Sequence, residues 1–142
     1  MAKIVLTNAY ILLGDTYDIS SYVTNLSLST THDIIETTQF GDIYKTRIAG
    51  LGDNQASFEF LQDFSSTIVN PGGLENVIYP LIGTAINCKI RPIDTTVSAS
   101  NPQYSFSLLI SEWQPLSGSV GELSTASVSW PISGAITKTT TP

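Results

Sequence analysis

The sequence has little of what most catalytic and metal-binding sites require. It contains one cysteine, Cys88, and one histidine, His32, among 142 residues. A single cysteine excludes an internal disulfide framework and fits folding in a reducing compartment such as the cytoplasm. A histidine without a second histidine or a nearby cysteine makes a poor metal site, so His32 is interpreted as a polar residue at a strand end. Cys88 shares the apolar face of a predicted strand with Ile86 and Ile90, which predicts a buried structural thiol.

Charged residues are also scarce, and basic ones most of all. They make up 13% of the chain, with 6 Lys and Arg against 12 Asp and Glu, which gives a formal net charge of -6. The basic residues do not cluster beyond Lys45 with Arg47 and Lys89 with Arg91. Proteins that grip nucleic acid do so largely through Lys and Arg contacts to phosphates, so the composition argues against such a function.

No apolar run approaches the roughly 20 residues that a membrane-spanning helix needs. Residues 3–13 are the most apolar stretch near the N-terminus, but Thr7 and Asn8 interrupt it and Gly14 ends it. We therefore expect a first strand at this position and not a signal peptide.

What the chain does have is serine, threonine and a normal apolar fraction. Hydrophobic residues make up 42% of it and aromatic residues 9%, which suits one domain of residues 1–142 with a hydrophobic core. Threonine is β-branched, and both hydroxyl residues suit exposed strand faces and turns. The composition therefore favours β structure.

Two segments of the last third alternate between apolar and polar residues, as strands with one buried face do. Their apolar positions are Tyr104, Phe106, Leu108 and Ile110 in the first segment, and Ala126, Val128, Trp130 and Ile132 in the second. Residues 114–122 between them are rich in turn residues. The two segments are predicted to form a long antiparallel pair.

Further strands are predicted at residues 22–29, 56–61 and 86–91. Apolar residues at helical spacing predict one short helix over 73–82, which Pro80 shortens or kinks and Gly83 ends. Residues 92–102 are predicted to be a polar loop, and residues 137–142 a polar tail. The prediction is a mainly β, antiparallel domain of about six to seven strands with one short flanking helix.

Residues 30–54 show no strict periodicity, and so long an extended loop is unusual inside a compact domain. The segment mixes Phe40 and Tyr44 with charges of both signs, a mixture that suits contact with another protein surface.

No catalytic or cofactor site can be assembled from the sequence. The acidic residues are scattered singly, and the glycines at 50–52 and 118–121 lack the spacing of a phosphate-binding loop. Trp130 shares a face with Val128 and Ile132, which predicts core packing. No enzymatic activity and no cofactor are expected.

The order of short motifs along nearly the whole chain resembles the major tail tube proteins of long-tailed, siphovirus-type bacteriophages. The matching pieces are DISSYV at 18–23, TTQFGD at 37–42, FEFLQDF at 58–64, LIG at 81–83, IRP at 90–92, NPQY at 101–104, GSVGEL at 118–123 and VSWP at 128–131. Pro80, inside the helix position, departs from the pattern of that family.

The resemblance implies a β-sandwich or half-barrel whose subunits form hexameric rings that stack into a tail tube. It implies an acidic-lined conduit that DNA crosses without specific binding, and tail terminator, tail tip and tape measure proteins as further partners. The place of action implied is the virion tail, with assembly in the host cytoplasm.

The resemblance also assigns two sets of residues. The contact loop to neighbouring subunits contains Thr38, Phe40, Asp42, Tyr44, Lys45 and Arg47. Candidate acidic positions in the lumen or on the surface are Glu59, Asp63, Glu112 and Glu122. The alternative function is a carbohydrate- or surface-binding β-sandwich module of a virion, for which Trp113 and Tyr104 are the candidate contact residues.

Overall fold

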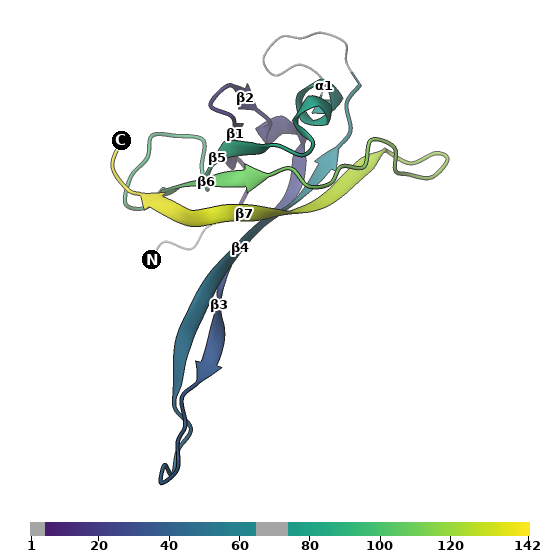
Figure 1. The fold of residues 1–142 in the computed structure, drawn as a ribbon. Coiled ribbons are helices and arrows are strands. Elements are labelled where there is room, and N and C mark those ends of the chain that lie inside the picture. The colour runs from purple at the N-terminus through teal and green to yellow at the C-terminus, as the bar shows by residue number, and fades with distance from the viewer. Residues whose placement is uncertain (1–4, 65–73) are drawn as a thin grey trace.

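A computed structural model describes residues 5–64 and 74–142. Over these residues the chain is mainly β, as predicted, with seven antiparallel strands in a single sheet of order β2-β1-β5-β6-β7-β4-β3 (Figure 1). The strands are β1 (Tyr10–Leu13), β2 (Tyr17–Asp18), β3 (Val23–Glu36), β4 (Arg47–Leu61), β5 (Ala85–Arg91), β6 (Gln103–Leu109) and β7 (Thr125–Thr139). The helical segments are η1 (Ser20–Tyr22), α1 (Leu74–Ile78) and η2 (Tyr79–Leu81).

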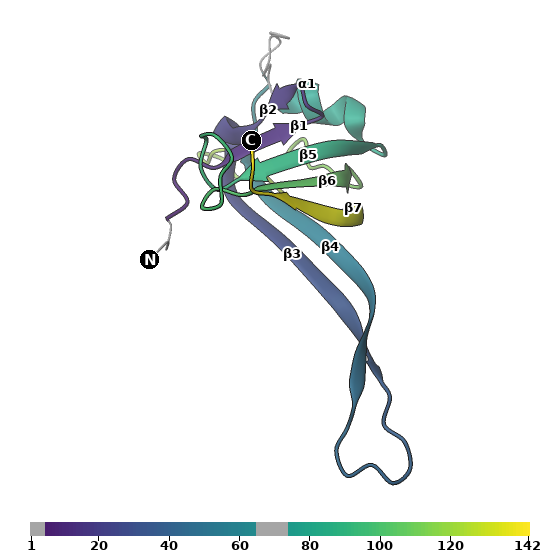
Figure 2. The same ribbon diagram turned by 90° about the vertical axis from the view of Figure 1, so that its left-hand side faces the viewer.

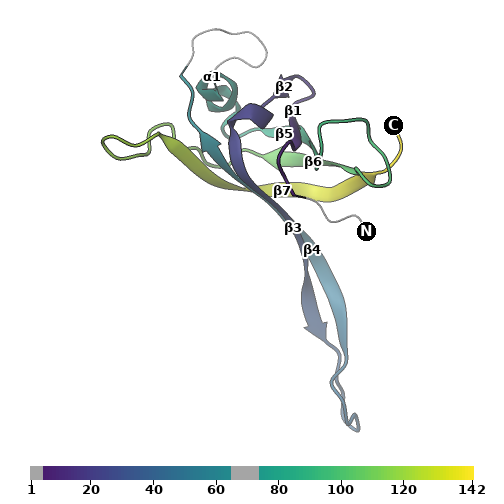
Figure 3. The same cartoon turned by 180° about the vertical axis from the view of Figure 1, so that it is seen from behind.

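The sheet bends so that its two ends approach each other through η1, which leads from β2 into β3 (Figure 3). The Ile19 N–H donates to the Ile11 carbonyl of β1 at 3.1 Å, so the start of β3 is fixed beside the other end of the sheet. Because all the described strands belong to one sheet, the fold is the half-barrel form of the prediction and not two facing sheets.

The C-terminal pair forms as predicted and provides the centre of the core. β6 and β7 are antiparallel, with Leu108 opposite Ile132, and β7 also pairs with β4. Trp130 is 0% exposed and contacts the rings of Phe58 and Phe60 at centroid distances of 5.7 and 5.9 Å. Its indole N–H donates to the Glu112 carbonyl at 2.7 Å, so the one polar atom of the side chain is satisfied inside the core.

The helical segment covers one face of this core and is shorter than predicted. α1 buries Leu74, Val77 and Ile78, and the chain then tightens into η2, which has Pro80 in its first turn. Proline has no N–H to continue an α-helix, which explains the change of helix type. Gly83, at φ +83°, follows as the predicted stop, whereas the predicted start at Gly73 lies outside the described residues.

The segment predicted as an extended loop, residues 30–54, is instead mostly a β-hairpin. β3 and β4 pair from Val23 opposite Phe60 to Glu36 opposite Arg47, with irregularities after Val23 and after His32, and only residues 37–46 form the connecting loop. β7 stops pairing with β4 at Asn54, so residues 31–53, here called the arm, project from the body (Figure 2). Both faces of the arm are exposed, which removes the apolar–polar alternation by which a strand is recognised.

Three smaller boundaries also differ. β7 continues through Thr139, opposite Gln103, so the predicted polar tail begins later than residue 137. The first strand covers Tyr10–Leu13 only, and the predicted Lys3 lies outside the described residues. β3 begins at Val23, one residue later than predicted, and a bulge between Val23 and Asn25 lets Val23 pack against the core.

None of the helices in residues 5–64 and 74–142 is long and apolar enough to cross a membrane.

Replacing Trp130 by alanine is expected to lower the free energy of unfolding by about 3–5 kcal/mol, because it leaves a cavity beside two aromatic rings. Urea unfolding followed by circular dichroism measures this. The matched control is Ser127→Ala on the exposed face of the same strand, with an expected change within about 0.5 kcal/mol. Equal effects of the two substitutions would contradict the placement of the core.

The thiol of Cys88 is fully buried, and desolvation raises its pKa to about 12. Only the thiolate reacts quickly with thiol reagents, so the native protein at pH 8 is expected to react with such a reagent only after unfolding. Full labelling of the folded protein within minutes would contradict the assignment of Cys88 to the core.

Candidate functional site: the arm and the sheet surface

The arm exposes apolar side chains along its whole length. Phe40 is 109% exposed and Tyr44 82% exposed relative to an isolated residue. The other large exposed apolar residues of the arm are Ile34, Ile35, Ile43, Ile48 and Leu51. Exposed apolar residues gathered on one projecting segment are typical of a surface that another molecule covers.

The tip of the arm, residues 37–46, is shaped by its own hydrogen bonds. The hydroxyl of Thr38 accepts the N–H of Thr46 at 3.0 Å, and a carboxylate oxygen of Asp42 accepts the N–H of Gln39 at 2.9 Å. Gly41 occupies the left-handed region at φ +94°. Several backbone N–H groups are thus bonded within the tip, which presents Phe40 and Tyr44 to solvent.

The six residues predicted to contact neighbouring subunits therefore lie together on the tip and the adjoining strand ends. The side chains of Thr38 and Asp42 accept backbone hydrogen bonds within the tip, a role that the sequence did not predict. Lys45 is exposed, and Arg47 opens β4 directly opposite Glu36. That these side chains contact another subunit stays a prediction at this point.

A second surface is the solvent face of the sheet, opposite the core. Across β4 and β7 it carries Glu59 near Ser57 and Ser129. The hydroxyls of these two serines are 3.2 Å apart. A carboxylate oxygen of Glu112 accepts the N–H of Ser129 at 2.9 Å, which places Glu112 beside the same serines. Two of the four predicted acidic positions thus share one hydroxyl-rich surface.

The other two predicted acidic positions lie elsewhere. Asp63 follows β4 and accepts a hydrogen bond from the phenol of Tyr22, whose pKa is raised by burial first and then by this carboxylate. Glu122 lies in the loop between β6 and β7, where its N–H donates to the Ser119 carbonyl at 3.0 Å. Asp63 therefore serves the junction between η1 and β4, which no sequence pattern indicated.

Basic residues on β5 occupy the far side of the same solvent face, and each has a partner. Lys89 forms an ion pair of 2.8 Å with Asp15. The guanidinium of Arg91 lies over the ring of Tyr10, 4.1 Å from its centroid. Glu59 and Glu112, beside β4 and β7, are therefore separated across the sheet from the basic residues of β5.

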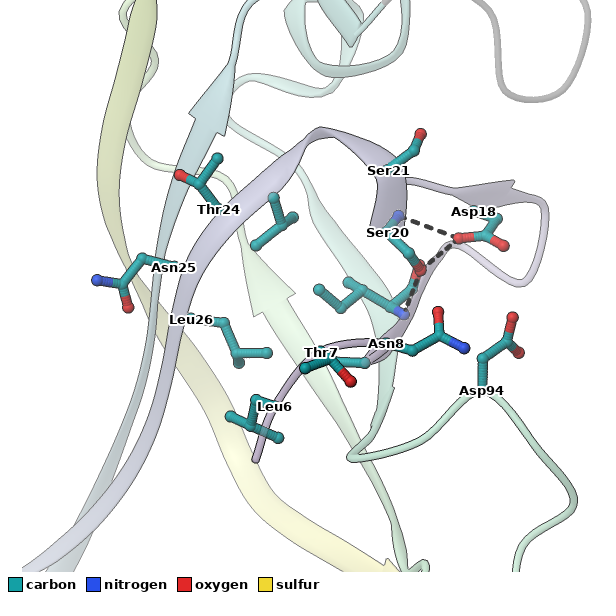
Figure 4. A pocket seen from close by; sticks show the side chains of 13 residues that line it. Leu6, Thr7, Asn8, Asp18, Ser20, Ser21, Thr24, Asn25, Leu26 and Asp94 are labelled. Atoms are coloured by element: carbon teal, nitrogen blue, oxygen red, sulfur yellow. Dashed lines mark hydrogen bonds between the residues drawn. The ribbon is translucent and has the colours of Figure 1, made fainter. Parts of the chain in front are cut away.

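A polar pocket of about 630 Å³ lies where the two ends of the sheet approach each other (Figure 4). Asp18 accepts both the N–H of Ser20, at 3.0 Å, and its hydroxyl, at 2.5 Å. The hydroxyl oxygen of Ser20 in turn accepts the N–H of Ile11 at 2.8 Å. These bonds fix η1 to β1, so the polar residues of the pocket hold the two ends of the half-barrel together.

The residues considered for chemistry do not converge. In the part of the chain that the structure describes, no group of three or more His, Cys, Asp or Glu could hold a metal ion. His32 is exposed on the arm, 3.2 Å from the Gly50 carbonyl. Trp113 packs edge-on against Phe60, and its indole N–H donates to the carboxylate of Glu75 at 2.7 Å. Tyr104 lies on β6, opposite Lys138 near the C-terminal end of β7.

No protein-family model matches the sequence, and no curated protein matches it. Solved structures do share the fold. A chain of the native gene transfer agent virion aligns with TM-score 0.70 and 11% identity over 96% of this chain and 99% of its own. A chain of the gene transfer agent tail, refined with C6 symmetry, aligns with TM-score 0.64 and 13% identity over 93% of this chain and 94% of its own. A chain of the six-fold symmetrised anti-feeding prophage baseplate aligns with TM-score 0.61 and 11% identity over 99% of this chain and 98% of its own.

Ser20→Ala is expected to lower the free energy of unfolding by about 1–3 kcal/mol, because the Ile11 N–H and the Asp18 carboxylate both lose a partner. Thermal unfolding measures the loss. Ser21→Ala, on the exposed neighbour, serves as the control and should leave the midpoint unchanged. A midpoint shift no larger for Ser20→Ala than for Ser21→Ala would show that these bonds do not hold the two ends of the sheet.

Proposed function

We propose that this chain is a structural virion protein that self-assembles into stacked hexameric rings, which form the tail tube of a phage-like particle. The observation that carries the proposal is the fold itself, which aligns over 93–99% of the chain with components of gene transfer agent and anti-feeding prophage particles in three solved structures. Two of these structures are described with six-fold symmetry.

The free edge of β3 supports assembly from copies of the chain. β3 is the last strand of the sheet and pairs with β4 alone along its 14 residues. A long unpaired edge exposes backbone donors and acceptors that favour pairing with another strand. In a ring, each copy covers the edge of the next, and closure leaves no edge open.

The arm supports a second direction of contact. It extends far beyond the body, so its apolar residues cannot be buried by the chain that carries them (Figure 2). In the proposal, the arm reaches a subunit of the neighbouring ring, with Phe40 and Tyr44 as anchors and Asp42, Lys45 and Arg47 as pairing charges.

The charge distribution suits a conduit for DNA. The chain carries a formal charge of -6, and across β4 and β7 its solvent-facing sheet surface combines serine hydroxyls with Glu59 and Glu112. Such a surface repels phosphates, so that DNA crosses the bore without specific binding. The role is structural, with no catalytic step and no cofactor. The tail terminator, tail tip and tape measure proteins are the further partners, and assembly takes place in the host cytoplasm.

Negative-stain microscopy of the concentrated protein, alone and with a tail initiator complex, is expected to show six-membered rings and hollow tubes. A protein that stays monomeric at high concentration, with the initiator as well as without it, would contradict the proposed function.

Replacing residues 38–45 by the turn Asn-Gly should abolish stacking while leaving the folded body intact. Thr37 and Thr46 already face each other, with a hydrogen bond of 2.8 Å from N–H to carbonyl, so a two-residue turn can join them. The removed residues contribute nothing to the core, so the unfolding midpoint is expected to stay within about 2 °C. Tubes of normal length from this variant would remove the arm from the assembly.

A further inference from the structure

The core face of the sheet opens into a groove at the base of the arm. The groove has a volume of about 810 Å³ and lies where β4 leaves β7 to continue into the arm. Its walls include apolar parts of Leu28, Tyr104, Ile132 and Ile136, with Asn54 inside and Lys138 at the C-terminal end of β7.

The groove results from a break in the pairing of β7. Asn54 opposite Ile132 is the last pair between β4 and β7. Directly after it, β7 bulges at Gly134, whose φ of +92° favours glycine, and continues along β6 alone. The core face of β4 therefore continues into the arm without a neighbouring strand to cover it.

Asn54 supplies an unused hydrogen-bond acceptor in this groove. The residue is only 8% exposed, and its amide nitrogen donates to the Gly134 carbonyl at 2.8 Å. That carbonyl is an acceptor, which fixes the orientation of the amide and leaves Oδ1 pointing elsewhere. Oδ1 is buried and has no hydrogen-bond partner among the described residues. Buried acceptors are nearly always satisfied, so the groove calls for a group that brings a donor.

The tip of the arm offers such a group. Tyr44 is 82% exposed and combines an apolar ring with an O–H donor. The exposed apolar residues of the other projecting loop, Leu116, Val120 and Leu123, have no side-chain donor. Ten residue steps separate Thr30 at the groove from Phe40 at the tip, about 33 Å at about 3.3 Å per step. The arm runs away from the body over this distance, so its tip cannot enter its own groove (Figures 1 and 2).

We infer that the groove at the base of the arm receives Tyr44 from the arm of a second copy, with the phenol O–H donating to Oδ1 of Asn54. This inference rests on the proposed function and names the receiving site for the arm. Asp42 on the tip and Lys138 beside the groove carry opposite charges, which suits the same docking. Tip and groove are different surfaces of the same chain. A copy whose tip is bound therefore still offers its groove to a further copy, so the contact can be repeated along the assembly.

Tyr44→Phe tests the hydrogen bond and keeps the ring. It is expected to raise the protein concentration needed for tube formation about 10-fold, the usual effect of leaving one buried acceptor unpaired. The matched control is Tyr79→Phe, since Tyr79 is also exposed but lies in η2, away from the arm (Figure 1). In the Asn54→Ala background, Tyr44→Phe should have no further effect. An unchanged concentration for Tyr44→Phe in the otherwise native chain would overturn the inference.

Cysteine cross-linking locates the tip independently and leaves both Tyr44 and Asn54 in place. The double variant Ile43→Cys with Thr30→Cys puts one thiol on the tip and one at the groove, where Thr30 is exposed, and buried Cys88 does not compete. Oxidation during assembly is expected to give a ladder of covalent multimers, because every copy carries both thiols. In the control, Ser127→Cys on the opposite face of the sheet replaces Thr30→Cys and should give no ladder.

The outcomes separate this inference from the proposed function. Tubes that form without a ladder from the groove variant would overturn the docking site and leave the tube function standing. A ladder from chains that form no rings or tubes would support the docking site and contradict the proposed function. A ladder from the Ser127→Cys control alone would place the tip on the solvent face of the sheet and overturn the inference.

Discussion

The structure depends on one strand that belongs to two different environments. From Leu61 back to Asn54, β4 lies between β3 and β7 and contributes Phe58 and Phe60 to the core. From Asp53 to Arg47 the same strand pairs with β3 alone and has solvent on both faces. Hydrogen bonding continues through the change, but hydrophobic burial stops. The body therefore stabilises itself, whereas the arm gains its burial only from another molecule.

Sequence patterns predicted the body well, apart from the two-residue β2, because its other strands have one buried face. The alternation around Phe106 and Trp130 correctly gave the central pair, and Pro80 correctly indicated a short helix. The arm gave no such signal, since a strand exposed on both faces has no reason to alternate. Gly50 and Gly52 also suggest a loop, although at Gly52 the absence of a side chain makes room for the ring of His32.

The candidate surfaces were predictable where they depend on a local segment and not where they depend on the fold. The contact residues from Thr38 to Arg47 are close in sequence, so they share the tip in any hairpin. The acidic residues come from distant elements, and spacing cannot show that Glu59 and Glu112 share a face while Asp63 is bound to Tyr22. The buried acceptor of Asn54 depends on the bulge at Gly134, 80 residues away, which no local pattern reveals.

The fold is shared with particle components at 11–13% identity, so the same fold is built although most side chains differ. The proposed function depends on surfaces that the isolated chain leaves uncovered. Hydrogen–deuterium exchange of the dilute monomer and of the assembled protein tests this directly. The account predicts that amides of residues 31–36 and 47–53 exchange quickly in the monomer and become strongly protected on assembly. Equal exchange of these amides in the two states would contradict it.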